Sequence, residues 1–342
     1  CGGIAIGIAS GLSPMYIAEV APTHIRGKLV SLNQLTIVIG ILAAQIVNWL
    51  LVSDDTAWNI EMAWRWMFWS AAFPALAFLV LAAFIPESPR WLAITGQRER
   101  AVATLTRIGG EDYAQSELTA LQTDMQHKQN QGGLSLLFSK PYRRVLLLGI
   151  IVAMFQQWCG TNVIFNYAQE VFQSAGYDVD NTFINIVVTG IANVIFTFVA
   201  IYTVDRLGRR ALMLLGAGGL AGIYLILGTC YYFEVSGIFM VILVVAAIAC
   251  YAMSLGPVTW VLLSEIFPNK VRGIAVATGT FALWIASFIL TYTFPFLNKA
   301  LGTAGTFWIY TAICAAGFIF FSFRLPETKG KSLEQLEKEM VG

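Results

Sequence analysis

Charged residues are scarce in this sequence. Only 12% of its 342 residues are charged, about half the fraction that soluble domains carry, while 57% are hydrophobic. A water-soluble core could not bury this much apolar surface, so the composition indicates a membrane protein. The net charge of +1 gives no reason to expect a nucleic-acid partner.

Histidine and cysteine, which build many catalytic and metal sites, are also rare. Both histidines, His24 and His127, lie in polar segments, and the five cysteines show no zinc or disulfide spacing. Four of the cysteines sit within apolar runs and fit small buried side chains. We therefore expect no catalytic residue, metal or cofactor, and a membrane enzyme is a weak alternative.

Long apolar runs are what the sequence has in abundance. Crossing about 30 Å of hydrocarbon takes roughly 20 helical residues. Residues 86–140 are polar, and the spacing of Leu105, Leu118 and Leu121 predicts short amphipathic helices there. The chain starts at Cys1 inside an apolar run without a signal-peptide pattern, so we expect it to begin within a membrane helix. The nine predicted spans cover about 2–20, 29–52, 64–85, 142–172, 181–204, 210–232, 237–263, 273–296 and 303–324.

The basic residues orient these spans. If the first span ends in the cytoplasm, only Arg65 and Lys299 of the 21 lysines and arginines fall on the opposite side. Cytoplasmic loops of membrane proteins carry such an excess of basic residues. We therefore predict a multi-pass protein of the cell (inner) membrane whose polar stretch 86–140 and C-terminus are cytoplasmic.

Two motifs occur twice. The pattern E-x-x-P-x-x-x-R-G covers 19–27 after the first span and 265–273 after the seventh, while Pro-Glu motifs at 86–90 and 326–330 follow the third and ninth spans. Spans one to three thus repeat as spans seven to nine, and spans four to six have no partner. The simplest completion is a protein of two six-helix halves, from which this chain lacks the first three helices.

The repeated motifs place charges at helix ends. Proline stops a helix and glycine allows a tight turn, so Glu and Arg from different helices can pair on the cytoplasmic face. Such pairs would hold one conformation and release another. Topogenic charges and simple helix stops are the alternative, and the duplication favours a latch. The predicted cytoplasmic charge latch comprises Glu19, Arg26, Glu87, Arg90, Asp205, Arg206, Arg210, Glu265, Arg272 and Glu327.

Amide side chains interrupt several spans. Polar groups at membrane depth are costly and are candidates for function, and span four is also broken by Gly160. Amides donate and accept hydrogen bonds as sugar hydroxyls do, and no span carries a central Lys or Arg that would suit an anion. Interhelical packing is the alternative, especially for Gln45 and Asn185. Trp260 and Trp284 lie mid-span, where they could pack or stack on a sugar ring.

Together the motifs resemble those of the sugar porter family of the major facilitator superfamily. The resemblance covers essentially the whole chain, and within the family it is closest to bacterial D-xylose/proton symporters. It rests on Tyr16–Gly27, Pro86–Leu92, Gln156–Asn162, Asp205–Arg210, Gly256–Gly273 and Pro326–Gly330.

The resemblance implies an all-α major facilitator fold, with the spans as helices 4–12 of twelve plus short cytoplasmic helices. Expected divisions are 1–85 (helices 4–6), 86–140 (linker), 141–325 (helices 7–12) and 326–342 (cytoplasmic tail). It implies sugar-binding roles for Gln34, Gln156, Gln157, Asn162, Asn193, Trp260 and Trp284, and gating roles for Asn166, Tyr167, Gly256 and Pro257.

The sequence departs from that family at three pocket positions. Asn166 replaces the first tyrosine of a Tyr-Tyr pair, Leu283 replaces an amide, and Ser287 replaces a common asparagine. These changes weaken the xylose assignment more than the sugar assignment. The aspartate that couples protons in the family lies in the first helix, outside this sequence.

The sequence thus predicts a transporter, not an enzyme. We expect alternating-access uptake of a neutral monosaccharide, D-xylose or a related pentose or hexose, with a co-transported proton, by a monomer in a lipid bilayer. A facilitative uniporter and a transporter-like sugar sensor are the alternatives.

Overall fold

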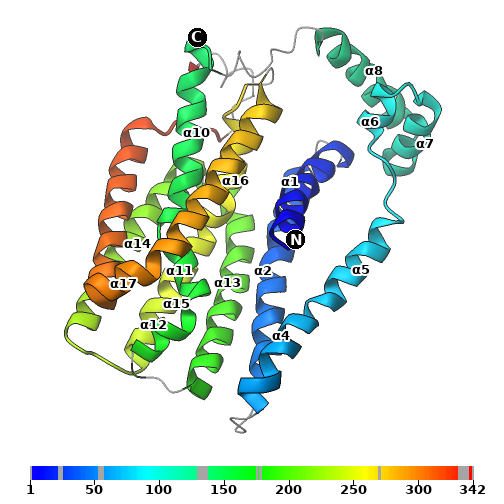
Figure 1. Cartoon of the computed structure of the whole chain (residues 1–342). Helices are drawn as coiled ribbons and strands as arrows, with labels where there is room; N and C mark the ends of the chain where they lie inside the picture. Colours follow the sequence, from blue (N-terminus) through cyan, green and yellow to red (C-terminus); the bar gives the residue numbers. More distant parts are fainter. Residues whose placement is uncertain are drawn as a thin grey trace.

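The computed structural model describes residues 2–21, 26–52, 58–128, 138–174, 176, 179–268, 271–329 and 339–340. Every regular element in these ranges is a helix (Figure 1). This is the outcome expected for spans in lipid, where each backbone polar group must be paired within its own segment. The helices are α1 (Gly2–Val20), α2 (Arg26–Leu51), the π-helix η1 (Asn59–Ala63), α4 (Trp64–Ser70), α5 (Ala72–Ala82), α6 (Pro89–Ile94), α7 (Arg98–Gly109), α8 (Glu111–Lys128), α10 (Lys140–Trp158), α11 (Thr161–Asn166), α12 (Ala168–Ser174), α13 (Val179–Leu207), α14 (Arg209–Tyr232), α15 (Ile238–Met253), α16 (Leu255–Glu265) and α17 (Arg272–Arg324).

Seven stretches of the described chain are long and apolar enough to cross a membrane. They are 32–51, 61–82, 142–166, 182–204, 209–232, 238–265 and 272–324. The last contains two predicted spans, because α17 consists of two helices that meet at a kink at Gly302, whose φ of 70° is left-handed. The predicted first span forms α1, but α1 is not one of the seven.

The helices α10–α17 form one bundle in Figure 1, and the main hydrophobic core lies among them. In it α17 packs along α10 and α14, and α15 packs against α13 and α14. Outside this bundle α2 lies along α13, and α1 lies against α2. The bundle is therefore built from the second part of the chain, α10–α17. Its main contact with the first part of the chain is the one between α13 and α2.

A second, small core joins α6, α7 and α8 at the end of the molecule where α10 begins (Figure 1). Its buried side chains include Leu92, Leu105 and Leu118. Leu105 and Leu118 are two of the leucines whose spacing predicted amphipathic helices in this polar stretch. The third, Leu121, has a side chain outside the described part of the structure.

Two spans are broken near their middles. The break between α10 and α11 falls at Gly160, as predicted, and its φ of 87° suits glycine. A Cβ there would lie 2.7 Å from Tyr310 Cγ, so the aromatic ring also requires a glycine. The break between α15 and α16 at Ser254 was not predicted. Buried polar side chains accompany both breaks, namely Gln156 and Gln157 before the first and Ser254 at the second.

Candidate transport site and charge cluster

Three amide side chains and one phenol form a continuous hydrogen-bonded chain at the first break. Gln156 Nε2 donates to the Tyr251 hydroxyl at 2.7 Å, and Gln157 Nε2 donates to Gln156 Oε1 at 2.7 Å. Asn162 Nδ2 in turn donates to Gln157 Oε1. We call these four residues the amide chain. It joins the end of α10 and the start of α11 to α15.

Geometry explains how neighbouring glutamines can share this chain. Gln156 and Gln157 point about 100° apart on an ideal helix, yet their long side chains reach each other. Both are buried, at 5% and 6% exposure, and burial makes each unmade hydrogen bond costly. Asn162 lies beyond the Gly160 break and is half-buried. The chain therefore runs from the protein interior toward a more accessible end.

The other predicted sugar-binding residues lie on α2, α13, α16 and α17 and do not join the chain. Asn193 is buried in α13, Gln34 and Trp260 are half-buried in α2 and α16, and Trp284 of α17 is 42% exposed. Among the described residues, no hydrogen bond links these four side chains to the amide chain. Their sugar-binding roles remain predictions.

The predicted gate residues lie at the end of α11 and at the start of α16. Tyr167 donates to the Thr291 carbonyl at 2.8 Å and packs its ring 4.5 Å from that of Phe294. Asn166 is exposed and donates to Thr291 Oγ1 at 3.3 Å. These contacts tie the end of α11 to α17. Their gating role stays a prediction.

Gly256 and Pro257, the other predicted gate residues, are buried at the start of α16. They follow Ser254, whose hydroxyl donates to the Cys250 carbonyl one turn earlier. Proline has no N–H to continue the helix, so its position is compatible with the break. The sequence signal for this break was therefore present as Gly256-Pro257, although the span was predicted as continuous.

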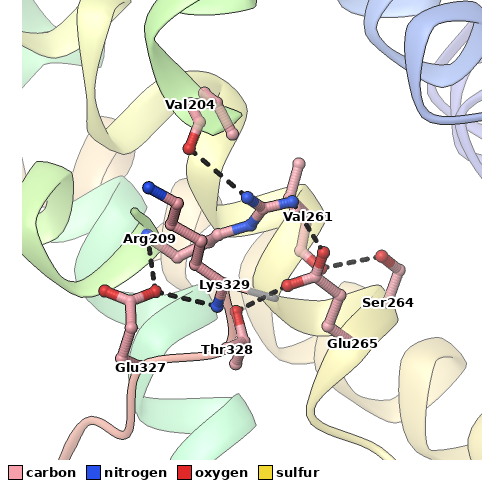
Figure 2. A network of polar contacts seen from close by, with 8 residues as sticks. All are labelled: Val204, Arg209, Val261, Ser264, Glu265, Glu327, Thr328 and Lys329. Carbon is pink, nitrogen blue, oxygen red and sulfur yellow. Dashed lines mark hydrogen bonds and ion pairs between the residues drawn. The ribbon is translucent and has the colours of Figure 1, made fainter. Parts of the chain in front are cut away.

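Charged side chains gather at the end of the bundle where α14 begins (Figure 2). Arg209 Nη2 lies 3.0 Å from Glu265 Oε1, and Thr328 donates to Glu265 Oε2 at 2.6 Å. Glu327 Oε1 accepts from the backbone N–H groups of Arg209 and Lys329. We call Arg209, Glu265, Glu327, Thr328 and Lys329 the Arg209 cluster. It joins α14, the end of α16 and the segment after α17.

Glu327 caps α14 from outside the helix. Its two carboxylate oxygens accept from the first backbone N–H groups of that helix, those of Arg209 at 2.9 Å and Arg210 at 3.1 Å. An anion is favoured at this positive end of the helix dipole. Partial burial raises the pKa of Glu327, but the backbone N–H donors of Lys329, Arg209, Arg210 and Thr328 outweigh it and hold the pKa below its usual value.

The structure distributes the predicted latch residues over several sites. Arg210 donates to the Ser322 carbonyl at 2.6 Å, and Arg272 donates to the Phe267 carbonyl at 3.3 Å. Arg206 and Glu87 are exposed. The side chains of Glu19, Arg26, Arg90 and Asp205 lie outside the described residues.

Arg209, which pairs with Glu265, and Thr328 were not among the predicted latch residues. Both lie within motifs that the sequence revealed, Asp205–Arg210 and Pro326–Gly330. The choice among Arg206, Arg209 and Arg210 depends on where α14 starts, which those motifs alone do not determine. No three His, Cys, Asp or Glu residues of the described ranges come together as a metal site.

Comparison with known proteins connects this geometry to a family. The family model for sugar (and other) transporters matches residues 1–340. The D-xylose-proton symporter of Escherichia coli (strain K12) is 42% identical over 98% of this chain and 69% of its own length. The arabinose-proton symporter of Bacillus subtilis (strain 168) is 39% identical over 98% of this chain and 73% of its own length.

Solved structures give the same result. The proton:xylose symporter XylE of the major facilitator superfamily, bound to 6-bromo-6-deoxy-D-glucose, superposes with a TM-score of 0.84 at 41% identity, covering 99% of this chain and 72% of that one. The inward-open form of XylE from E. coli gives a TM-score of 0.83 at 40% identity, covering 99% and 71%.

Proposed function

We propose that this chain, which belongs to the sugar transporter family of the major facilitator superfamily, carries a neutral monosaccharide across the membrane together with a proton. Membership of this family makes the chain a membrane-spanning transporter and not an enzyme. D-xylose is the first substrate to test, because the relative at 42% identity is named for it. Arabinose is the second candidate, from the relative at 39%.

The amide chain is the observation that carries this proposal. Its members occupy a helix break inside a span, the arrangement by which many transporters build a midplane substrate site. Each amide retains donors or acceptors beyond the bonds of the chain, and sugar hydroxyls can use both. Trp260 and Trp284 would add flat faces for the C–H surface of the ring.

The proposed mechanism is alternating access. The sugar binds at the amide chain, and the half containing α10–α17 then moves relative to the half containing α1–α5. The α2–α13 contact joins the two and would be the surface along which they move. The Arg209 cluster would hold the helix ends of the α10–α17 half in one conformation and release them in the other.

We place the protein in the inner membrane with the Arg209 cluster and the helices α6–α8 on the cytoplasmic side. The distribution of basic residues supports this orientation, since all but Arg65 and Lys299 fall on that side. We further propose that the transporter works as a monomer within the bilayer.

Uptake of labelled D-xylose into proteoliposomes tests the proposal. We expect uptake by the intact protein, stimulation by an inward proton gradient, and loss of at least about tenfold in Gln157→Ala and Trp260→Ala, as expected when buried hydrogen bonds or ring contacts are removed. Gln115→Ala and Trp69→Ala are matched controls, because both side chains are exposed and belong to α8 and α4, which contribute no residue to the amide chain. Undiminished uptake in both site variants would refute the site, and uptake indifferent to the proton gradient would favour a uniporter.

A further inference from the structure

Tyr251 ends the amide chain and lies next to a helix break. It is buried in α15, three residues before Ser254, where α15 gives way to α16. A Cβ at Gly256 would lie 3.3 Å from Tyr251 Cε1, which is tighter than ordinary contact. The small residue at 256 therefore leaves room for the phenol ring. Both the ring and the hydroxyl of Tyr251 are held in place.

The hydrogen bonds of the chain have a direction. Each amide donates one N–H to the next member on the Tyr251 side: Asn162 donates to Gln157, Gln157 to Gln156, and Gln156 to Tyr251. The bond from Gln156 occupies a lone pair of the Tyr251 oxygen and leaves its O–H free to donate. Asn162 keeps its carbonyl oxygen as an acceptor. A sugar hydroxyl, which donates and accepts, is matched by either end.

The orientation of the chain depends on its buried end. Gln156 is 5% exposed, so its Nε2 cannot exchange the phenol for bulk water. Loss of the Tyr251 hydroxyl would leave a buried amide N–H unpaired, which is costly. The Gln156 amide would turn to find another partner, and Gln157 and Asn162 would lose the acceptors that now orient them.

We infer that Tyr251 is a positioning residue for sugar recognition, which acts by fixing the amide of Gln156 and, through it, those of Gln157 and Asn162. The inference rests on the proposed function, because it assigns Tyr251 to the same monosaccharide site. It adds a phenol to a site whose predicted sugar-binding residues are amides and tryptophans. It also implies that the three amides recognise the sugar together, because the orientation of each depends on the next.

Tyr251→Phe in the intact protein tests the inference. We expect the dissociation constant for D-xylose to rise about tenfold, equal to about 1.4 kcal/mol, while the maximal uptake rate changes less than about twofold. Tyr310→Phe is the matched control. Its hydroxyl is also buried, but it has no hydrogen-bond partner among the described residues, so its loss should change sugar affinity less than about twofold.

A double-mutant cycle shows whether Tyr251 acts through Gln156. The variants Tyr251→Phe, Gln156→Leu and their combination are compared for sugar affinity, and for thermal unfolding without sugar. If Tyr251 only orients Gln156, the double variant binds sugar no more weakly than Gln156→Leu, and the two losses of unfolding temperature are also less than additive.

Sugar affinity and thermal unfolding together distinguish a failure of this inference from a failure of the proposed function. Fully multiplicative losses of affinity, or wild-type affinity in Tyr251→Phe, would overturn the positioning role while leaving sugar transport intact. Wild-type protein that binds neither D-xylose nor arabinose would overturn the proposed function and the sugar role of Tyr251 with it. The unfolding cycle would then still report whether the phenol anchors the amides.

Discussion

Arg209 of α14 and Glu265 of α16 are paired at 3.0 Å, with their side chains 13% and 24% exposed. A pair this protected from water is screened less by salt than a surface pair. Removal of one member also lowers the stability of the protein more than it would at the surface. Glu265 also accepts from Thr328 after α17. The pair thus connects three segments far apart in the sequence.

Arg209→Ala should weaken transport without weakening sugar binding. The variant leaves Glu265 partly buried without its cation, at a cost of about 2 kcal/mol, and loosens the ends of α14 and α16. We expect a lower unfolding temperature and a several-fold lower uptake rate with D-xylose affinity unchanged. Arg206→Ala is the matched comparison, because that neighbouring side chain is exposed. Equal losses in the two variants would contradict a specific role for the Arg209–Glu265 pair.

Glu327→Gln should destabilise the protein in a pH-dependent way. Because the pKa of Glu327 is lowered in the folded protein, its carboxylate contributes stability above its unfolded pKa and loses it as pH falls through the folded pKa. Capping of α14 by the charged form contributes about 1 kcal/mol.

Unfolding temperatures of wild type and Glu327→Gln, measured from about pH 7 down to about pH 3, test this linkage. The gap between the two proteins should be widest at neutral pH and close at the acid end. Glu234→Gln, an exposed turn residue, should follow the wild type throughout. A gap of constant size across the range would mean that the carboxylate charge of Glu327 is not what stabilises α14.

Gly160→Ala should disrupt the amide chain through the backbone. The left-handed φ of Gly160 costs an L-residue about 1–2 kcal/mol, and the new methyl group would press on the Tyr310 ring. We expect a marked fall in unfolding temperature and in D-xylose affinity. Gly222→Ala is the control, because Gly222 lies within α14 and a Cβ added there has no neighbouring atom within 4 Å. Equal tolerance of both changes would argue against strain at the break.

Tyr167→Phe should loosen the contact between α11 and α17. The variant keeps the ring packing against Phe294 and removes only the bond to the Thr291 carbonyl, worth about 1 kcal/mol. If this contact closes the outer end of the site, sugar should dissociate several-fold faster while the unfolding temperature changes little. Stopped-flow tryptophan fluorescence would measure the rate. Asn166→Ala, which removes the exposed and longer bond to Thr291, should have a smaller effect.

Sequence patterns were sufficient where local chemistry decides structure. The break at Gly160 was predictable because glycine interrupts a span that is already rich in amides. The helices of the polar stretch followed from the spacing of Leu105 and Leu118. The break at Ser254 was missed because the span was judged by its apolar length, although Gly256-Pro257 just after it is a pair that can interrupt a helix.

Residues whose roles depend on tertiary contacts could not be chosen from the sequence. Tyr251 lies in an apolar run, and this sequence context predicts only a core aromatic residue. Its contact with Gln156 depends on the tertiary structure. Arg209 is one of three arginines in a short motif, and only the start of α14 separates its environment from that of Arg206. The tryptophans and Asn193 lie in spans, as expected from the sequence.

The junction at Glu265 has a kinetic consequence. Its carboxylate binds α14 through one oxygen and the segment after α17 through the other, so removing α16 from this end breaks both bonds together. The barrier to separation then contains both bonds. Opening at this end should therefore occur in a single activated step, whose rate responds more steeply to temperature than the loss of one hydrogen bond would allow.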